Sequence, residues 1–549
     1  MHMVDLKEIK KQIEGEVFQD SETLEKYSHD ASIFEVRPEA VIFPKNSQDL
    51  KNLVTWVSKN KKKNNSLSIT ARSGGTCMAG GSINDSIILD FTQHFNRVLE
   101  VGKGAAVTEP GVYYRDFEPQ TLKKNLLLPC YTASRSINTV GGMVGNNSAG
   151  EKTLSFGQTK DFVEELTVVL SDGNEYVLGP LDEKALEAKM KLTTFEGQVY
   201  RDTYRLLKEN YDQIQKAKPQ TSKNSAGYLL WEVWDKKTFN LAKLFTGSQG
   251  TLGLVIKIKF RLVKPKPESS MVVMFLKDLK PLGSLVKRVL EFKPETFESF
   301  DKSTFKLAMK YLPEMMMQMK GNIISLGFSF LPEIWLTLTG GVPELVLIAE
   351  FTDQTHEAAF KSATKVSEVV KKEFGINVHV TKSPREAQKY WTVRRESFNL
   401  LRKHVRGRKS APFIDDIIVK PEFMPEFLPK LNAILQKYPS LIYTIAGHAG
   451  NGNFHIIPLM DLSKESERQI IPKLSEEVYD LVLKYQGSTT GEHNDGLIRT
   501  PYLEKMYGKE VCELFAQTKQ IFDPLNIFNP RKKVNGDLAY AMSHIRTKS

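Results

Sequence analysis

Residues 72–81 read RSGGTCMAGG and lie between two apolar segments, 66–71 and 87–91, that we predict to be strands. Because glycine has no Cβ atom, the backbone amides of such a stretch can approach an anion closely and surround a pyrophosphate. The stretch has neither a Walker lysine nor a GxGxxG motif followed by a helix, which excludes a P-loop and the fingerprint of the doubly wound dinucleotide-binding fold. We interpret it as a phosphate-binding loop without a helix; standing alone, it could equally be an ordinary glycine-rich loop.

Two more glycine-rich stretches follow, TVGGMVGNNSAG at 139–150 and GSQGTLG at 247–253. We expect the first to be a loop ahead of a β-hairpin, whose strands 162–170 and 175–178 flank an Asp-Gly turn. The second opens a long strand over 254–263. Three such stretches in one region favour a single large cofactor that lies along the backbone.

The sequence KPKP at 264–267 indicates a domain boundary. Beyond it, strands predicted at 271–276 and 345–351 alternate with helices predicted at 279–292 and 357–374. This α+β pattern is typical of an antiparallel sheet that is covered on one face.

Two histidines, His448 and His455, flank the glycine-rich turn at 447–453, and the pair Glu492 and His493 follows later. Two imidazoles and a carboxylate can hold a divalent metal and leave positions open for a substrate. Each histidine alone is more simply a core or turn residue, but glycines crowd both segments. Since neighbouring side chains on a regular element point apart, Glu492 as ligand and His493 as base could serve one substrate only from irregular backbone.

Arg394 lies on a helix-like segment, 383–401, that runs into the basic residues at 402–409. The planar guanidinium suits a carboxylate, so an arginine here could clamp an acidic substrate. A solvated basic helix end is the alternative. A weaker third hypothesis is a peripheral membrane contact through this basic run and the apolar segment 323–338, which at 16 residues is too short to span a bilayer.

Composition narrows the class of protein further. With 549 residues and 41% hydrophobic content the chain has room for two to four domains. Three cysteines without a CxxC pair argue against a zinc ribbon, a cysteine-held iron–sulfur cluster and a disulfide framework. The net charge of +11 is a modest excess that gives no reason to expect nucleic-acid binding. The polar N-terminus lacks the apolar core of a secretory signal, so we expect a cytoplasmic protein, with the inner membrane face as a peripheral alternative.

The order of the motifs in this chain resembles that in the FAD-linked D-2-hydroxyacid dehydrogenases. These motifs are the three glycine-rich stretches, GHAG at 447–450 with His455, GEH at 491–493, and Asn529-Pro530. That family includes D-lactate dehydrogenases, the glycolate oxidase flavin subunit and D-2-hydroxyglutarate dehydrogenases. The resemblance covers residues 37–535. It implies an α+β fold, with a two-subdomain FAD-binding domain of the vanillyl-alcohol-oxidase (PCMH) type and an α+β cap domain built on an antiparallel sheet.

The resemblance also implies how the chain divides. Residues 1–36 would form an N-terminal helical segment and 37–265 the FAD-binding domain. Residues 266–515 would form the cap, or substrate, domain with the metal site, and 516–549 a segment that returns to the FAD-binding domain.

The cofactor implied is FAD, held without a covalent bond, because Thr76 stands where histidine-linked members of the wider fold carry their attachment histidine. The residues implied to bind it are Arg72, Ser73, Gly74, Gly75, Thr76, Gly80, Gly81, Gly142, Asn147, Ser148, Gly150, Gly250, Gly253, Val255 and Asn529. Gln249 departs from the glutamate that is common in the third glycine-rich stretch.

The resemblance further implies a zinc or manganese ion on His448, His455 and Glu492. Arg394 would pair with the substrate carboxylate and His493 would act as the base. Asn494 departs from the glycine that commonly follows the Glu-His pair.

The activity implied is oxidation of a small anionic D-2-hydroxy acid (D-lactate, D-2-hydroxyglutarate or glycolate) to the 2-oxo acid. Hydride would pass to the flavin, and the metal would assist loss of the hydroxyl proton. Residues 492–501 look most like long bacterial members that carry a C-terminal iron–sulfur module. No such module follows in this sequence, so we expect electrons to leave to another acceptor, such as a quinone, an electron-transfer protein or an iron–sulfur partner.

Three alternatives stay open at this point. One is an oxidase of the same fold that passes electrons to oxygen. Another is a non-redox transferase of the ether-lipid synthase type, and the third is a catalytically silent FAD-binding or anion-binding protein.

Overall fold

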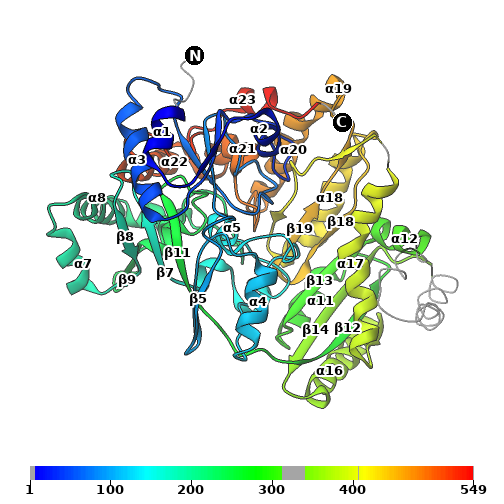
Figure 1. Ribbon diagram of the computed structural model, residues 1–549. Coiled ribbons are helices and arrows are strands. Elements are labelled where there is room, and N and C mark those ends of the chain that lie inside the picture. Colours follow the sequence, from blue (N-terminus) through cyan, green and yellow to red (C-terminus); the bar gives the residue numbers. More distant parts are fainter. Residues whose placement is uncertain (1–5, 312–313, 315–340, 406, 548–549) are drawn as a thin grey trace.

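The computed structural model describes residues 6–311, 314, 341–405 and 407–547 (Figure 1). The apolar segment 323–338 and Arg406 lie outside the described residues, so the membrane contact suggested for them stays a prediction. Within the described ranges, no helix combines the length and the apolar character needed to cross a bilayer.

The first sheet is mixed and has four strands. Their spatial order is β1 (Glu16–Phe18), β2 (Ala40–Phe43), β4 (Ile87–Asp90) and β3 (Ile69–Arg72). Strands β2 and β3 run parallel to β4, whereas β1 is antiparallel to β2. Segment 1–36 was expected to be helical, and it holds helices α1 (Leu6–Gln12) and α2 (Ser21–Tyr27). It also contains strand β1, so it is not helical alone.

Helix α3 (Ser47–Asn60) covers the first sheet with Leu50, Leu53 and Val57, which are buried at helical spacing. Its N-cap is Asn46, whose side chain accepts a hydrogen bond from the Asp49 amide.

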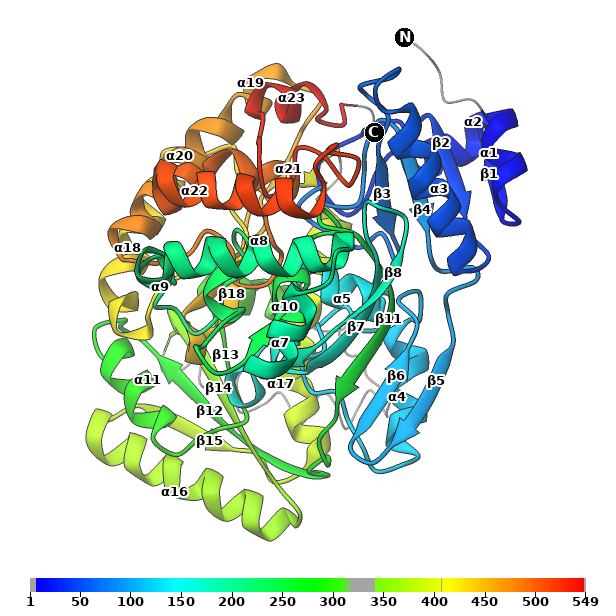
Figure 2. The ribbon, with the colours of Figure 1, turned by 90° about the vertical axis from the view of Figure 1, so that its left-hand side faces the viewer.

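The second sheet is antiparallel and has five strands. Their order is β5 (Val98–Gly102), β6 (Ala105–Thr108), β11 (Leu254–Arg261), β7 (Val163–Val169) and β8 (Glu175–Leu178). The predicted hairpin of β7 and β8 is confirmed by their antiparallel register. Figure 2 shows helices α8 (Phe195–Glu209) and α22 (Leu503–Phe522) side by side near this sheet.

The glycine-rich stretch at 139–150, expected to be a loop, instead begins with helix α5 (Val140–Asn146). The Thr139 hydroxyl caps the helix by accepting from the Gly142 amide, and Val140, Met143 and Val144 bury an apolar stripe. Packing therefore overrides the low helix propensity of glycine here.

The third sheet, in the second half of the chain, is antiparallel and has seven strands. Their order is β15 (Asn377–Val380), β12 (Glu268–Leu276), β14 (Leu345–Asp353), β13 (Thr296–Asp301), β18 (Ile445–His448), β19 (Asn453–Ile456) and β17 (Ile417–Ile418). This cap sheet confirms the expected α+β architecture.

The expectation that helices cover only one face of the cap sheet is wrong. Helices α11 (Leu282–Leu290) and α16 (His356–Phe374) pack on the face that carries Val272 and Met274 of β12. Helices α12 (Lys302–Lys310) and α17 (Pro384–His404) pack on the other face. The unbroken apolar run MVVMFL at 271–276 accounts for this, since a strand buried on both faces has no polar side.

Two helices follow the cap sheet, α19 (Glu465–Arg468) and α20 (Ile470–Lys484), and Pro472 lies in the first turn of the second. After α22 the chain is non-helical over 523–530 and runs along β3. The Ile69 amide donates to the Ile527 carbonyl at 2.7 Å, and the Asn529 amide donates to the Ile69 carbonyl at 2.9 Å.

Candidate functional site

A cavity of about 620 Å³ lies where the glycine-rich stretches meet the cap sheet and helix α17. The predicted site residues that line it are Arg72, Ser73, Gly74, Gly75, Thr76, Gly81, Gly142, Ser148, Gly150, Gly250, Gly253, Val255, Arg394, His448, His455, Glu492 and His493. Segments that are hundreds of residues apart in sequence therefore share one cavity.

Three predicted residues lie behind the cavity wall rather than on it. Gly80 packs against Phe34, and its φ of +77° is one that L-residues rarely adopt. Asn147 is buried and ends α5 in the left-handed conformation. The side-chain amide of Asn529 donates to the carbonyls of Gly81 (2.9 Å) and Gln249 (2.7 Å), so it connects two of the glycine-rich stretches.

Polar groups of the cavity wall fit an anionic cofactor. Nη1 of Arg72 and both amide atoms of Asn138 are buried, and no hydrogen-bond partner is found for them among the described residues. A Cβ atom added to Gly145, which also lines the cavity, would meet no atom within 4 Å. Buried polar groups normally have partners, so this wall suits a ligand such as the FAD implied by the sequence.

A tight hairpin positions the two predicted histidine ligands. His448 ends β18 and His455 lies in β19, and their ring centroids are 5.2 Å apart. Gly447 permits the close approach of the two strands, because a Cβ atom there would lie 2.1 Å from the Asn453 carbonyl.

Glu492 joins this pair from another part of the chain. Its Oε1 atom is 3.1 Å from Nε2 of His448, and ligand atoms of His448, His455 and Glu492 all lie within 4.8 Å of one another. Two imidazoles and a carboxylate in this arrangement are a suitable donor set for zinc or manganese.

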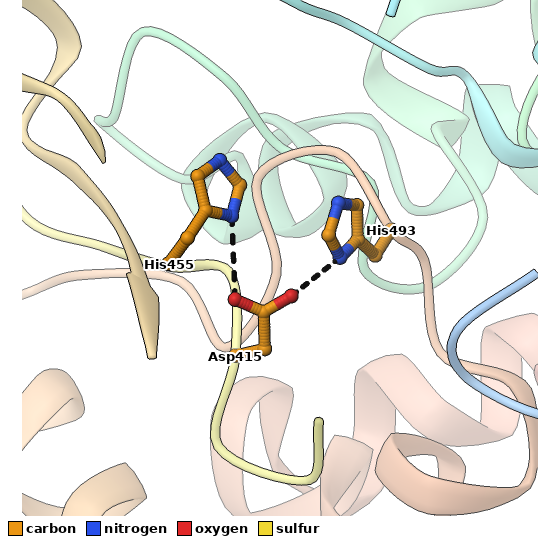
Figure 3. Close-up of side chains that lie close together, drawn as sticks. All are labelled: Asp415, His455 and His493. Carbon is orange, nitrogen blue, oxygen red and sulfur yellow. Dashed lines mark hydrogen bonds and ion pairs between the residues drawn. The ribbon is translucent and has the colours of Figure 1, made fainter. Parts of the chain in front are cut away.

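Asp415, which sequence reasoning missed, lies between two of the histidines (Figure 3). Its carboxylate is 3.3 Å from Nδ1 of His455 and 2.8 Å from Nδ1 of His493. Burial alone would raise the pKa of Asp415, but the imidazoles of His493 and His455 hold it well below its usual value. Asp415 therefore orients both rings, and with them it forms an alternative set of metal ligands.

Its neighbour Asp416 shapes the irregular backbone that Glu492 and His493 need. The Asp416 carboxylate accepts hydrogen bonds from the amides of both residues at 2.7 Å. Burial would lower the pKa of His493, but the carboxylates of Asp416 and Asp415 raise it to about 9.

Two further charged residues contact the predicted ligands. The buried Lys223 donates to Oε1 of Glu492 at 2.5 Å. Glu298, on β13, accepts from Nε of Arg394 at 3.1 Å and lies 2.5 Å from Nδ1 of His448. Burial alone would lower the pKa of His448, but the carboxylates of Glu298 and Glu492 raise it. Neither Lys223 nor Glu298 belongs to a recognisable motif, so only the fold identifies them.

Comparison with protein families finds two matches in this chain. Residues 38–179 match an FAD binding domain, and residues 265–533 match the C-terminal domain of FAD linked oxidases. The two matches include most of the segments that line the cavity, but the third glycine-rich stretch at 247–253 lies between them.

Among curated proteins, the chain is similar to a D-2-hydroxyglutarate dehydrogenase of Pseudomonas putida, with 26% identity over 94% of this chain and 50% of that protein. The chain thus spans about half the length of this relative. It is 27% identical to the glycolate oxidase subunit GlcD of Bacillus subtilis, over 92% of this chain and 91% of the relative. It is also 24% identical to a D-lactate dehydrogenase of Archaeoglobus fulgidus, over 90% and 91%.

Among solved structures, 4-ethylphenol oxidase from Gulosibacter chungangensis matches with a TM-score of 0.68 and 14% identity, covering 97% of each chain. p-Cresol methylhydroxylase matches with a TM-score of 0.65 and 16% identity, covering 95% of this chain and 94% of that one. At such identities the likeness shows the fold alone, and it confirms the predicted PCMH-type fold.

Proposed function

The chain belongs to the FAD-linked oxidases that include the D-2-hydroxyacid dehydrogenases, and we propose that it oxidises a D-2-hydroxy acid to the 2-oxo acid. The observation that carries this proposal is the single cavity whose wall combines the glycine-rich stretches with His448, His455, Glu492 and Arg394. The residues proposed to bind flavin, metal and the substrate carboxylate thus line one cavity.

Two bound groups would supply the chemistry that side chains lack. FAD held noncovalently by the glycine-rich stretches accepts a hydride, and zinc or manganese held by His448, His455 and Glu492 lowers the pKa of an alcohol as a Lewis acid. The chain itself binds and orients the substrate and removes its proton.

Arg394 would bind the substrate carboxylate. Glu298 holds its Nε atom, and no described residue accepts a hydrogen bond from its two terminal nitrogens, which leaves these free for a ligand. A guanidinium anchored in this way presents a fixed pair of donors to a carboxylate.

His493 would accept the hydroxyl proton. Its Nδ1 atom faces Asp415, so Nε2 is available to the substrate. To act as a base the imidazole must be neutral, and the positive charge of a metal on the neighbouring ligands would lower its pKa toward that state. The electrons would then leave to a quinone, an electron-transfer protein or an iron–sulfur partner.

Flavin absorption of the purified protein tests this proposal. Under anaerobic conditions, at least one of D-lactate, glycolate and D-2-hydroxyglutarate should bleach the flavin, whereas L-lactate should not. His448→Ala should retain flavin but lose the bleaching, because it removes a metal ligand outside the glycine-rich stretches. A flavin that none of these acids reduces would contradict the proposal.

A further inference from the structure

A second arginine stands beside Arg394 in the cavity wall, but a carboxylate already neutralises it. Nε and Nη2 of Arg395 each donate to Glu151 at 2.6 Å, one nitrogen to each carboxylate oxygen. The Glu151 side chain is 6% exposed and that of Arg395 34%, and the guanidinium stacks on the Trp391 ring at 4.5 Å. This bidentate, stacked arrangement fixes Arg395 in place.

The basic residues of the cavity wall therefore differ in how far their charge is already paired. The described wall has three arginines. Arg72 stacks on Tyr27 within the glycine-rich part, and Arg395 is paired with Glu151 through Nε and Nη2. Arg394 bonds Glu298 through Nε, and no described residue accepts a hydrogen bond from either of its terminal nitrogens. Glu396 adds another carboxylate to the wall next to Arg395.

The rest of the wall on the cap side is neutral. Thr304, Asn399, Thr444, Ala446 and Ile457 contribute hydroxyl, amide and apolar surface, and the Asn399 side-chain amide donates to Glu396 at 3.0 Å. A substrate whose 2-hydroxy acid end is held by Arg394 would meet these residues, the neutralised pair of Glu151 and Arg395, and the carboxylate of Glu396 with its other end. A second carboxylate on the substrate would be repelled by Glu396, and the described residues of the cap-side wall offer it no lysine or arginine that lacks a carboxylate partner.

We propose that the site selects 2-hydroxy monocarboxylates over dicarboxylates, and that Glu151 determines this specificity by neutralising Arg395. The inference rests on the proposed function and adds the substrate class. With FAD bound, the C2 hydrogen would leave as hydride to the flavin, the hydroxyl proton would pass to His493 and a C2=O double bond would form, whichever acid is used.

Two acids of equal length isolate the effect of the second carboxylate. D-2-Hydroxyvalerate and D-2-hydroxyglutarate both have five carbons and differ only in a terminal methyl or carboxylate group. With the FAD- and metal-loaded protein, kcat/KM for flavin reduction should favour the monocarboxylate by about tenfold or more, the scale of one unfavourable charge contact. Dissociation constants of 2-oxovalerate and 2-oxoglutarate, read from the shift of the flavin spectrum, should show the same preference.

Glu151→Gln should free Arg395 for the second carboxylate. The ratio of dicarboxylate to monocarboxylate kcat/KM should then rise by about tenfold, and the double variant Glu151→Gln/Arg395→Met should lose that gain. Glu373→Gln is the matched control, because Glu373 makes the same bidentate contact with Arg288, whose side chain is also 34% exposed, away from the cavity.

A wild-type protein that binds and oxidises the dicarboxylate as well as the monocarboxylate would overturn the inference even if no variant folds. An unchanged ratio in folded Glu151→Gln, or no spectral shift with either 2-oxo acid, would also overturn it. If the monocarboxylate preference appears in binding while neither acid reduces the flavin, the specificity stands and the proposed dehydrogenase activity fails.

Discussion

Nδ1 of His448 lies 2.5 Å from Oε1 of the buried Glu298, whose other oxygen accepts a hydrogen bond from Arg394. One carboxylate therefore orients a predicted metal ligand and the predicted substrate arginine. Carboxylates that hold a ligating histidine raise its basicity and fix its ring.

Glu298→Gln should weaken metal binding by about 10–100-fold, because the neutral amide holds His448 less strongly. Competition with a chromogenic chelator measures this affinity without relying on turnover. Glu295→Gln is the control: Glu295 is equally buried and pairs with Lys152, outside the donor set. Equal metal affinity in Glu298→Gln and wild type would remove Glu298 from the metal site.

Arg394→Lys should raise KM for the 2-hydroxy acid by about tenfold or more and change kcat less. A lysine amine cannot hold Glu298 and make a bidentate contact with the substrate at once. Steady-state kinetics with an artificial electron acceptor give both constants. The exposed Arg402 lies on the same helix, so Arg402→Lys serves as control. A KM that does not move would assign the substrate carboxylate to another residue.

Gly145→Leu should reduce the flavin content of the purified protein by about tenfold or more, because the added side chain extends into open cavity space and competes with FAD. The fold itself should persist, since a leucine is favoured over glycine inside a helix. Gly102→Leu, also in open space but outside the cavity, should keep its flavin. Flavin absorbance per protein and far-ultraviolet circular dichroism check both points. A fully loaded Gly145→Leu protein would place the cofactor elsewhere.

Stability should depend on pH through Lys532. Burial, assisted by Arg531, lowers the pKa of this lysine to about 7, whereas its pKa in an unfolded chain is about 10.4. Between these values the unfolded chain holds a proton that the folded chain has released, so raising the pH stabilises the folded state.

Lys532→Met removes this buried amine. Its melting temperature should exceed that of the wild type at about pH 6.5, and the difference should shrink by about pH 9.5, where the cost of burying the charge has largely gone. The exposed Lys63 gives a control variant, Lys63→Met, for which we expect no such trend. A difference for Lys532→Met that grows with pH would contradict the assignment.

Local sequence patterns predicted much of the fold. Apolar runs between turn residues marked some of the strands in each of the three sheets, such as β4, β7 and β12. The prediction of a loop at 139–150 was wrong because it followed the glycine content of this stretch. The apolar spacing of Val140, Met143 and Val144 was the sequence signal that indicates α5.

The predicted metal ligands could be found in sequence because glycines and histidines cluster around them. The residues that orient them could not. Asp415, Lys223 and Glu298 reach the site from three separate segments, and each resembles many other charged residues in the chain. Only tertiary packing distinguishes a buried carboxylate that holds an imidazole from one on the surface.

The rate of anaerobic flavin reduction before and after metal removal tests the central claim most directly. Stopped-flow mixing of the chelator-treated protein with a D-2-hydroxy acid should show flavin that stays oxidised, and adding back zinc or manganese should restore bleaching. In Glu492→Ala the flavin should stay bound and oxidised whether or not metal is added. Rapid bleaching of a protein shown to be free of metal would contradict the account.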